Sequence, residues 1–129
     1  MNQRNLPKPT EAELAILQVL WERGPSTVRL VQDQLAASRG TGYTTSLKLM
    51  QIMFDKGLLH RDDSNRSHVY SAATSREKTQ RQIVGQMLDQ VFEGSAQQLI
   101  LQALSAKKSS RAERDEIRKL IDKLDGGSQ

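Results

Sequence analysis

Five neighbouring side chains offer hydroxyl, amino and amide groups at helical spacing: Tyr43, Thr44, Thr45, Lys48 and Gln51. A helix would carry Thr44, Lys48 and Gln51 on one side, because residues three and four apart are neighbours on a helix surface. Short hydroxyls and flexible donors can follow base edges and phosphates in a major groove, which is wide enough to admit a helix. The chemistry that this set suggests is recognition of duplex DNA.

The other side of the same segment is suited to a protein core, with Ser46, Leu49, Met50 and Met53 at spacings of three and four. We expect it to pack on a first helix that carries Leu14, Leu17, Leu20 and Trp21. The recognition helix is predicted to run roughly from Tyr43 to Asp55 and to stop at Gly57, where a glycine can take left-handed geometry. The acidic Asp55 lies at the far end, which favours entry into the groove by the N-terminus.

Three features around this helix could hold backbone phosphates. Thr27 closely follows the turn at Gly24 and Pro25, and glycines at positions 40 and 42 open the recognition helix. A polar hairpin after the helix carries Arg61 and Arg66. Together they predict phosphate contacts around one helix. The alternative for Arg66 is an exposed pair with a neighbouring aspartate, which would contribute little in water.

Helix starts are marked by capping boxes, in which a Ser or Thr and a Glu or Gln three residues later satisfy orphan backbone N–H groups. Four occur here: Thr10 with Glu13, Thr74 with Glu77, Ser95 with Gln98, and Ser110 with Glu113. Two further helices are expected from Ser26 and from Gly42. Residues 58–60 and 67–71 are predicted to form a hairpin with a polar turn at 62–65.

This order predicts a mainly α fold, in which three helices and a β-hairpin wing form a winged helix-turn-helix DNA-binding domain over residues 10–73. Three later helices, residues 74–125, form a dimerisation domain, because one copy could not fully cover their apolar stripes. The alternative is a self-contained helical subdomain. Residues 1–9 are expected to be a tail and 126–129 a disordered end. The residues that we expect to form the dimer interface are Ile83, Met87, Val91, Leu99, Ile100, Ala103, Leu104, Ile117, Leu120, Ile121 and Leu124.

Bulk composition excludes several classes of protein. The chain has 129 residues and no cysteine, which removes disulfides and thiolate metal sites. Its net charge of +4 is compatible with nucleic acid without locating a binding face. Apolar runs are too short for membrane insertion, and the first nine residues do not resemble a secretion signal, so we expect a cytoplasmic protein.

Two alternatives to DNA binding are open. His60 and His68 on the hairpin, with Asp62 and Asp63 in its turn, could in principle hold a metal for an enzyme. A solvated wing with two ordinary histidines is preferred, because a short hairpin encloses no pocket. We therefore expect no enzymatic activity, no metal and no cofactor. A winged helix that binds proteins is the second alternative, but its signature would be an apolar wing or recognition face.

Three stretches carry a resemblance to a known family: TEAELAILQVLWERGPSTVRLV, GYTTSLKLMQIMFDKGLL and FEGSAQQLIL. Over about residues 10–124 the chain resembles the BlaI/MecI penicillinase-repressor family. The most specific positions are Glu13 and Leu14 with Leu20 and Trp21, the run from Tyr43 to Thr45, Lys56 with Gly57, and Gly94 with Ser95.

The resemblance implies a bacterial homodimer that represses a promoter from a palindromic operator, controls a resistance or stress operon, and leaves when a membrane sensor-protease triggers its cleavage. It puts Thr44, Thr45 and Lys48 in the groove and Arg66 in the wing. It also makes the last three helices an intertwined dimerisation domain.

The sequence departs from the family at two places. Ile52 and Met53 stand where the family usually has an Arg-Leu pair, so a common polar contact of the recognition helix is missing. Gln102 and Ala103 mark the candidate proteolytic region, but the best-known members carry an Asn-Phe pair there. Copper-responsive relatives have cysteine pairs near the C-terminus, and this chain has no cysteine.

Overall fold

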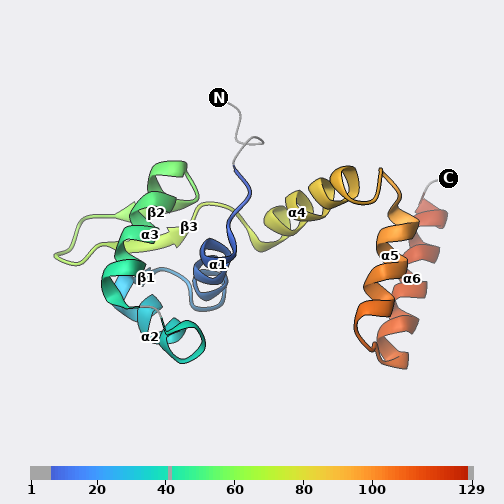
Figure 1. The fold of residues 1–129 in the computed structure, drawn as a ribbon, viewed down its shortest axis with the longest axis horizontal. Coiled ribbons are helices and arrows are strands. Elements are labelled where there is room, and N and C mark those ends of the chain that lie inside the picture. The colour runs from blue at the N-terminus through green and yellow to red at the C-terminus, as the bar shows by residue number, and fades with distance from the viewer. Residues whose placement is uncertain (1–6, 41, 128–129) are drawn as a thin grey trace. The chain divides into compact units, whose positions relative to one another are not determined.

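The computed structural model describes residues 7–40 and 42–127 and divides into two compact units, Met1–Val84 and Gly85–Gln129. The first unit contains three helices, a small sheet and the start of a fourth helix (Figure 1). Its elements are α1 (Glu11–Arg23), β1 (Ser26–Thr27), α2 (Val28–Arg39), α3 (Tyr43–Lys56), β2 (Leu59–Asp62) and β3 (Val69–Ala72). Helix α4 (Arg76–Gln90) crosses the boundary, and α5 (Ala96–Ala106) and α6 (Arg111–Gly127) complete the second unit.

The core of the first unit lies where α1, α2 and α3 meet the sheet. Its buried apolar residues come from α1, α2, α3, β2 and β3, and from Leu58 between α3 and β2. They are Ile16, Leu17, Val19, Leu20, Val28, Val31, Leu35, Met50, Met53, Leu58, Leu59 and Tyr70. The sheet is antiparallel with the order β1-β3-β2, so β3 is central. Tyr70 pairs with Ser26 on one side and with Arg61 on the other. The hairpin of β2 and β3, with the loop of residues 63–68, is called the wing below.

A buried glutamate joins the start of α1 to the end of α3. Glu13 completes the predicted capping box with Thr10, since each residue's backbone N–H donates to the other's side chain, at 3.2 and 3.0 Å. Its second carboxylate oxygen lies 2.7 Å from the Lys56 ammonium, and Glu13 is only 2% exposed. Burial alone would raise the pKa of Glu13, but the hydrogen bonds from Lys56 and Thr10 bring it below its ordinary value. Glu13 therefore stays ionised in the folded protein at neutral pH.

Two predicted helix starts are shifted by one residue. Thr27, not Ser26, caps α2 by accepting from the Leu30 N–H at 3.2 Å, and Ser26 with Thr27 forms the unexpected strand β1. At α4 it is Ser75, not Thr74, whose hydroxyl accepts from a first-turn N–H, that of Lys78, at 3.1 Å. The Thr74 carbonyl instead accepts from the Trp21 indole at 2.9 Å. This hydrogen bond ties the segment leading into α4 back to α1.

The chain ends differ in part from the expected tail and disordered end. Gly126 and Gly127 belong to α6, so the disorder expected from residue 126 is wrong for these two. Residues 128 and 129, and residues 1–6 of the tail, lie outside the described residues. Of the remaining tail, residues 7–9 form no helix or strand, and Pro9 is buried. The first unit extends to Val84, beyond the boundary expected after residue 73.

The second unit is helical and leaves most of its apolar side chains in solvent. Ser95 caps α5 by accepting from the Gln98 N–H at 3.1 Å, and Ser110 accepts from the Glu113 N–H at the start of α6. No residue of α5 or α6 is buried in the part of the chain that the structure describes. Over those same residues, none of the helices combines the length and apolarity that crossing a lipid bilayer requires.

Candidate nucleic-acid interface

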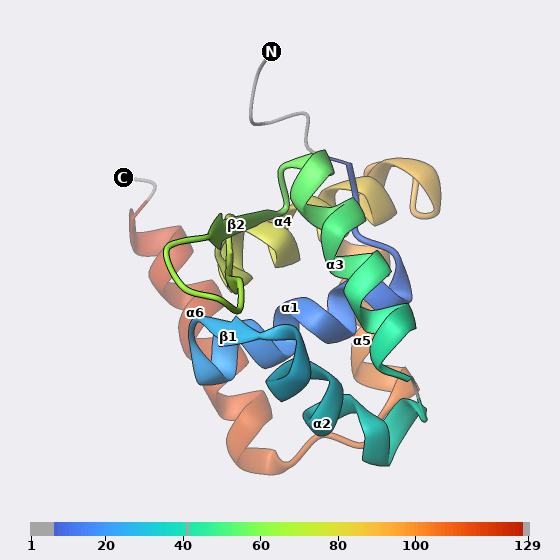
Figure 2. The same cartoon turned by 90° about the vertical axis from the view of Figure 1, so that its left-hand side faces the viewer.

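Helix α3 presents its two sides as the sequence predicts. Ser46, Met50 and Met53 are buried, and Leu49 is half-buried. Gly57 ends the helix with φ 89°, a left-handed conformation that favours glycine. The opposite side is in solvent and carries the predicted contacts Thr44, Thr45, Lys48 and Gln51. Tyr43 is exposed as well, but helical spacing puts it on the flank next to Met50. Figure 2 shows α3 and α2 with the loop that follows β2 on one side of the first unit.

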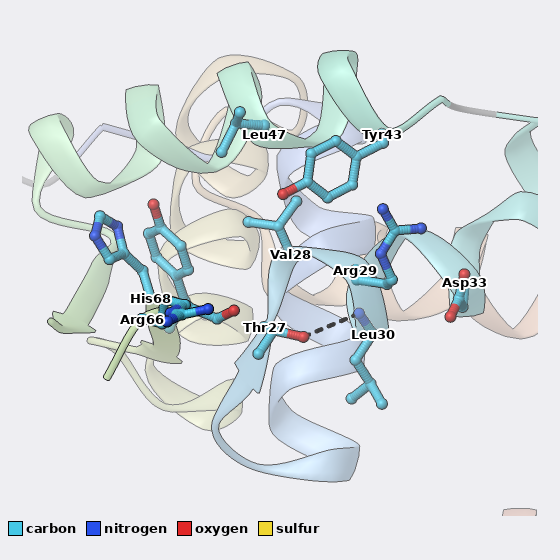
Figure 3. Close-up of a pocket in the computed structure, with 11 residues that line it drawn as sticks. Thr27, Val28, Arg29, Leu30, Asp33, Tyr43, Leu47, Arg66 and His68 are labelled. Carbon is cyan, nitrogen blue, oxygen red and sulfur yellow. Dashed lines mark hydrogen bonds between the residues drawn. The ribbon is translucent and has the colours of Figure 1, made fainter. Parts of the chain in front are cut away.

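A hollow of about 530 Å³ opens between the start of α2, the start of α3 and the wing (Figure 3). Its lining includes Thr27 of β1, Arg29 of α2, and Tyr43 and Leu47 of α3. Its lining from the wing includes Arg66 and His68. The hollow thus brings together three residues that the sequence predicts as separate contacts, Thr27, Tyr43 and Arg66. Two cationic guanidinium groups, one from α2 and one from the wing, border the same space.

Arg29 is a member of this surface that sequence analysis missed. Its guanidinium carbon lies 4.8 Å from the centre of the Tyr43 ring, a cation–π contact that joins α2 to α3. The first turn of α2 contains no acidic residue, so the cation stands at the positive end of the helix dipole, while Asp33, one turn further along α2, lines the same hollow. A basic residue in the first turn of the helix before a recognition helix is the signal that could have identified it.

The two arginines of the wing have different surroundings. The Arg61 guanidinium lies 4.2 Å from the centre of the Phe54 ring, and its Nε is 2.8 Å from the Asp63 carboxylate. The neighbouring Tyr70 hydroxyl and then Asp63 raise the pKa of Arg61 above its ordinary value. Arg61 is therefore engaged inside the first unit, where its charge holds β2 to α3 and to the turn of the wing.

Arg66 is exposed and has no ion-pair partner among the residues that the structure describes. The two aspartates that could have paired with it have other contacts. Asp62 accepts from the Ser64 N–H at 2.9 Å, and Ser64 lowers the pKa of Asp62. Asp63 pairs with Arg61 and lies 3.6 Å from His68. The Arg66 guanidinium is thus available to an anion.

The two histidines of the hairpin have different surroundings. His60 pairs in register with Ser71 on β3, while His68 lies at the hollow and faces Asp63. Across residues 7–40 and 42–127, no group of three or more histidine, aspartate or glutamate side chains could hold a metal ion. The functional interpretation of the wing therefore depends on its arginines and its turn, and not on its histidines.

The predicted dimerisation residues are largely uncovered in the single chain. Seven of them have 37% to 74% of their surface exposed. They are Met87 on α4, Val91 just after α4, Ile100 and Leu104 on α5, and Leu120, Ile121 and Leu124 on α6. Ala103 is also exposed, whereas Ile83, Leu99 and Ile117 are half-buried. Gln102 and Ala103, the candidate proteolytic region, lie inside helix α5 on its exposed surface. A protease would have to unwind α5 locally to reach the bond between them.

Three helices, a small antiparallel sheet with a protruding hairpin, and an exposed polar α3 define a winged helix-turn-helix, the fold of a large class of DNA-binding regulators. The chain belongs to the penicillinase repressor family, whose model matches residues 9–123. It is thus a transcriptional regulator of the DNA-binding, non-enzymatic kind, and both the fold and the family predicted from the sequence are confirmed.

Curated relatives agree with this assignment. Two Mycobacterium tuberculosis proteins, from strains CDC 1551 / Oshkosh and ATCC 25618 / H37Rv, are named Transcriptional regulator BlaI. Each is 28% identical to this chain over 122 residues, which cover 91% of this chain and 85% of the relative.

Solved structures similar to this chain include reduced AbfR bound to DNA and a MepR-like protein complexed with pseudoligands. Both give a TM-score of 0.44 at 15% identity. The first match covers 93% of this chain and 74% of AbfR, and the second covers 84% of this chain and 68% of the MepR-like protein. Because such scores do not establish a common fold, the assignment rests on the family match.

Proposed function

We propose that two copies of this chain bind one dyad-symmetric operator in duplex DNA and repress the promoter there. The observation that carries the proposal is the outer face of α3, where Thr44, Thr45, Lys48 and Gln51 are all exposed on a helix whose other side is anchored in the core. A polar, anchored helix of this kind can enter a major groove without rearrangement.

The surroundings of α3 supply phosphate contacts on both of its flanks. Arg29 and the amide N–H groups at the start of α2 would meet one stretch of backbone, because a helix N-terminus and a cation both attract phosphate. Arg66 would meet another stretch from the wing. These contacts fix the position of the protein, while Thr44, Thr45 and Gln51 face the base edges. In this proposal Arg61 stabilises the wing and does not itself bind DNA.

The second unit would provide the dimer. Large leucine and isoleucine side chains are exposed along α5 and α6, and a contiguous apolar surface of this kind marks an interaction site. A second copy presents the same stripes, and a twofold interface is complementary to itself. Two recognition helices related by that twofold axis would then read two half-sites about one helical turn, ~34 Å, apart.

Selection of bound duplexes from a random-sequence pool tests this function. The proposal predicts an inverted repeat in the recovered DNA, and loss of that repeat when the selection uses the variant Thr44→Ala with Thr45→Ala. Lys78→Ala removes an exposed cation on α4 away from this face and serves as the matched control, which should recover the wild-type repeat. Recovery of a direct repeat or of no common sequence would refute the proposal.

Regulation of a resistance or stress operon, with release by a membrane sensor-protease, completes the proposal. The candidate cut lies between Gln102 and Ala103 in α5, in the part of the chain assigned to the dimer. Cutting there would separate α6 from the rest of the second unit and so weaken the dimer. Mass spectrometry of the repressor from induced cells would detect fragments that end at this bond, and an intact chain after induction would exclude this route.

A further inference from the structure

Large apolar side chains are rarely exposed in the first unit, and three of them gather at the proposed DNA surface. Among its described residues, those in solvent are Leu30, Tyr43, Ile52 and Val84. Leu30 and Tyr43 line the hollow beside α3 (Figure 3), and Ile52 lies on α3 itself, with 39% of its surface exposed. Ile52 is the only one of these four that is neither in the hollow nor on α4.

The position of Ile52 on α3 places it within the recognition face. Successive residues of an α-helix turn by about 100°, so Ile52 lies one turn beyond Lys48 and two turns beyond Thr45 on nearly the same side. Lys48 is at the middle of the exposed arc, with Thr44 and Gln51 on one flank and Thr45 and Ile52 on the other. A helix that brings Thr45 and Lys48 to the groove also brings Ile52 there.

The chemistry of an isoleucine selects among the groups in the major groove. Each base pair presents hydrogen-bond donors and acceptors there, and thymine adds a 5-methyl group. Ile52 can offer no hydrogen bond, so a cytosine amino group or a guanine carbonyl that faced it would lose water without compensation. A thymine methyl would instead be buried favourably against the Ile52 side chain.

We propose that Ile52 is a specificity-determining residue that recognises the methyl group of one thymine in each half-site. This inference rests on the proposed binding of operator DNA by α3. It assigns to Ile52 an apolar contact at a position where the family usually carries an arginine. The operator preference of this chain therefore includes a thymine that a relative with arginine would not require.

Replacement of thymine by deoxyuridine tests the contact, because this change removes the 5-methyl group and leaves all hydrogen-bonding atoms in place. On an operator recovered by selection, each thymine of a half-site is replaced singly and the affinity is measured. One replacement should weaken wild-type binding about fourfold, the effect of losing one buried methyl group. The same replacement should have no effect on Ile52→Ala, and Gln51→Ala should still show the fourfold loss.

Each outcome decides the proposal. If no thymine shows the loss with the wild-type protein, or if the loss persists in Ile52→Ala, the assignment is overturned. Should Ile52→Ala bind too weakly to measure, Ile52→Val provides a smaller truncation that must reduce the fourfold loss. Failure of the wild-type protein to bind any duplex would instead contradict the proposed function, so the two failures are distinguishable. Thermal melting of Ile52→Ala and Ile52→Val should give the wild-type melting temperature, because the Ile52 side chain is exposed.

Discussion

The basic side chains of the first unit differ in whether they already contact an acidic or aromatic side chain of the protein. Lys48 and Arg66 are exposed and make no ion pair with any described residue, whereas Arg61 is held by Phe54 and Asp63. A cation that is already paired gains less from a phosphate, because it must first give up its partner. The contributions of these three residues to DNA binding should therefore differ although their charges are equal.

Substitution of Lys48 or Arg66 by alanine should weaken DNA binding and flatten its salt dependence. Each lost phosphate contact reduces the slope of log affinity against log salt by ~0.9, because fewer counterions are released. Titrations at several salt concentrations give this slope. Arg61→Ala is the matched control and should lower the melting temperature while the slope changes little. Wild-type affinity and slope in both Lys48→Ala and Arg66→Ala would contradict the interface.

The exposed face of α3 was predictable from the sequence because helical spacing alone separates it from the buried face. The surroundings of the arginines were not predictable in the same way. The contact of Arg61 with Phe54 depends on how β2 lies against α3, and the contact of Arg29 with Tyr43 depends on how α2 lies against α3. Such contacts arise from packing between elements, which no local pattern in the sequence records.

At the scale of elements, α1 and α3 are joined at their ends by the ion pair of Glu13 with Lys56. Glu13 is almost fully buried, while the Lys56 side chain is 34% exposed. Removal of the lysine would leave a buried carboxylate with one fewer hydrogen bond, which costs about 1.5–3 kcal/mol for a charged group. The pair therefore helps to set the position of α3 against α1.

Acid should destabilise the wild-type protein through Glu13. Because the pKa of Glu13 is lower in the folded protein than its ordinary 4.5, its contribution is complete above about pH 4.5 and is lost as the pH falls through the folded-state pKa. Lys56→Met should lower the free energy of unfolding at pH 7 and make its decline in acid shallower.

Urea unfolding between pH 3 and pH 7 measures both effects. Lys48→Met changes an exposed lysine of the same helix and should keep the wild-type profile. An acid decline in Lys56→Met as steep as that of the wild-type protein would show that Glu13 does not depend on Lys56.

The helices were easier to predict than their first residues or the sheet. Capping motifs identified α1, α5 and α6 because the cap is a local interaction of side chain with backbone. At α4 the sequence predicted Thr74 as the cap, but Ser75 caps the helix. The Thr74 carbonyl accepts a hydrogen bond from the indole of Trp21, which is distant in the sequence. Strand β1 escaped prediction because its two residues pair with β3 through the backbone, which leaves no pattern of side chains in the sequence.

At the scale of the whole molecule, the apolar stripes of the second unit should mediate dimerisation. Leu120 is 61% exposed on α6 although it is large and apolar. Placing a charge there would force a desolvated ion into a twofold interface, once from each subunit. Leu120→Lys should therefore shift the protein from dimer to monomer in sedimentation equilibrium, whereas Lys119→Ala, at the neighbouring exposed position, should leave the dimer intact. A dimeric Leu120→Lys protein would exclude this stripe from the interface.

Truncation should separate folding of the first unit from dimerisation. A chain ending at Val84 keeps Arg76 over the Trp21 ring, at 5.7 Å, and the Trp21 hydrogen bond to Thr74. It should fold cooperatively as a monomer and bind the operator much more weakly than the full chain, because the two half-sites are no longer engaged together. Light scattering and DNA titration provide the test, and a dimeric truncation would place the interface in the first unit.

Footprinting of the full chain on its selected operator tests whether two α3 helices of one dimer read a dyad-symmetric site. We expect two equivalent blocks of major-groove protection about one helical turn, ~34 Å, apart and related by a dyad. In each block, protection should be lost with Thr44→Ala and Thr45→Ala together. A single asymmetric block, or protection that survives this double substitution, would show that two α3 helices do not read the site together.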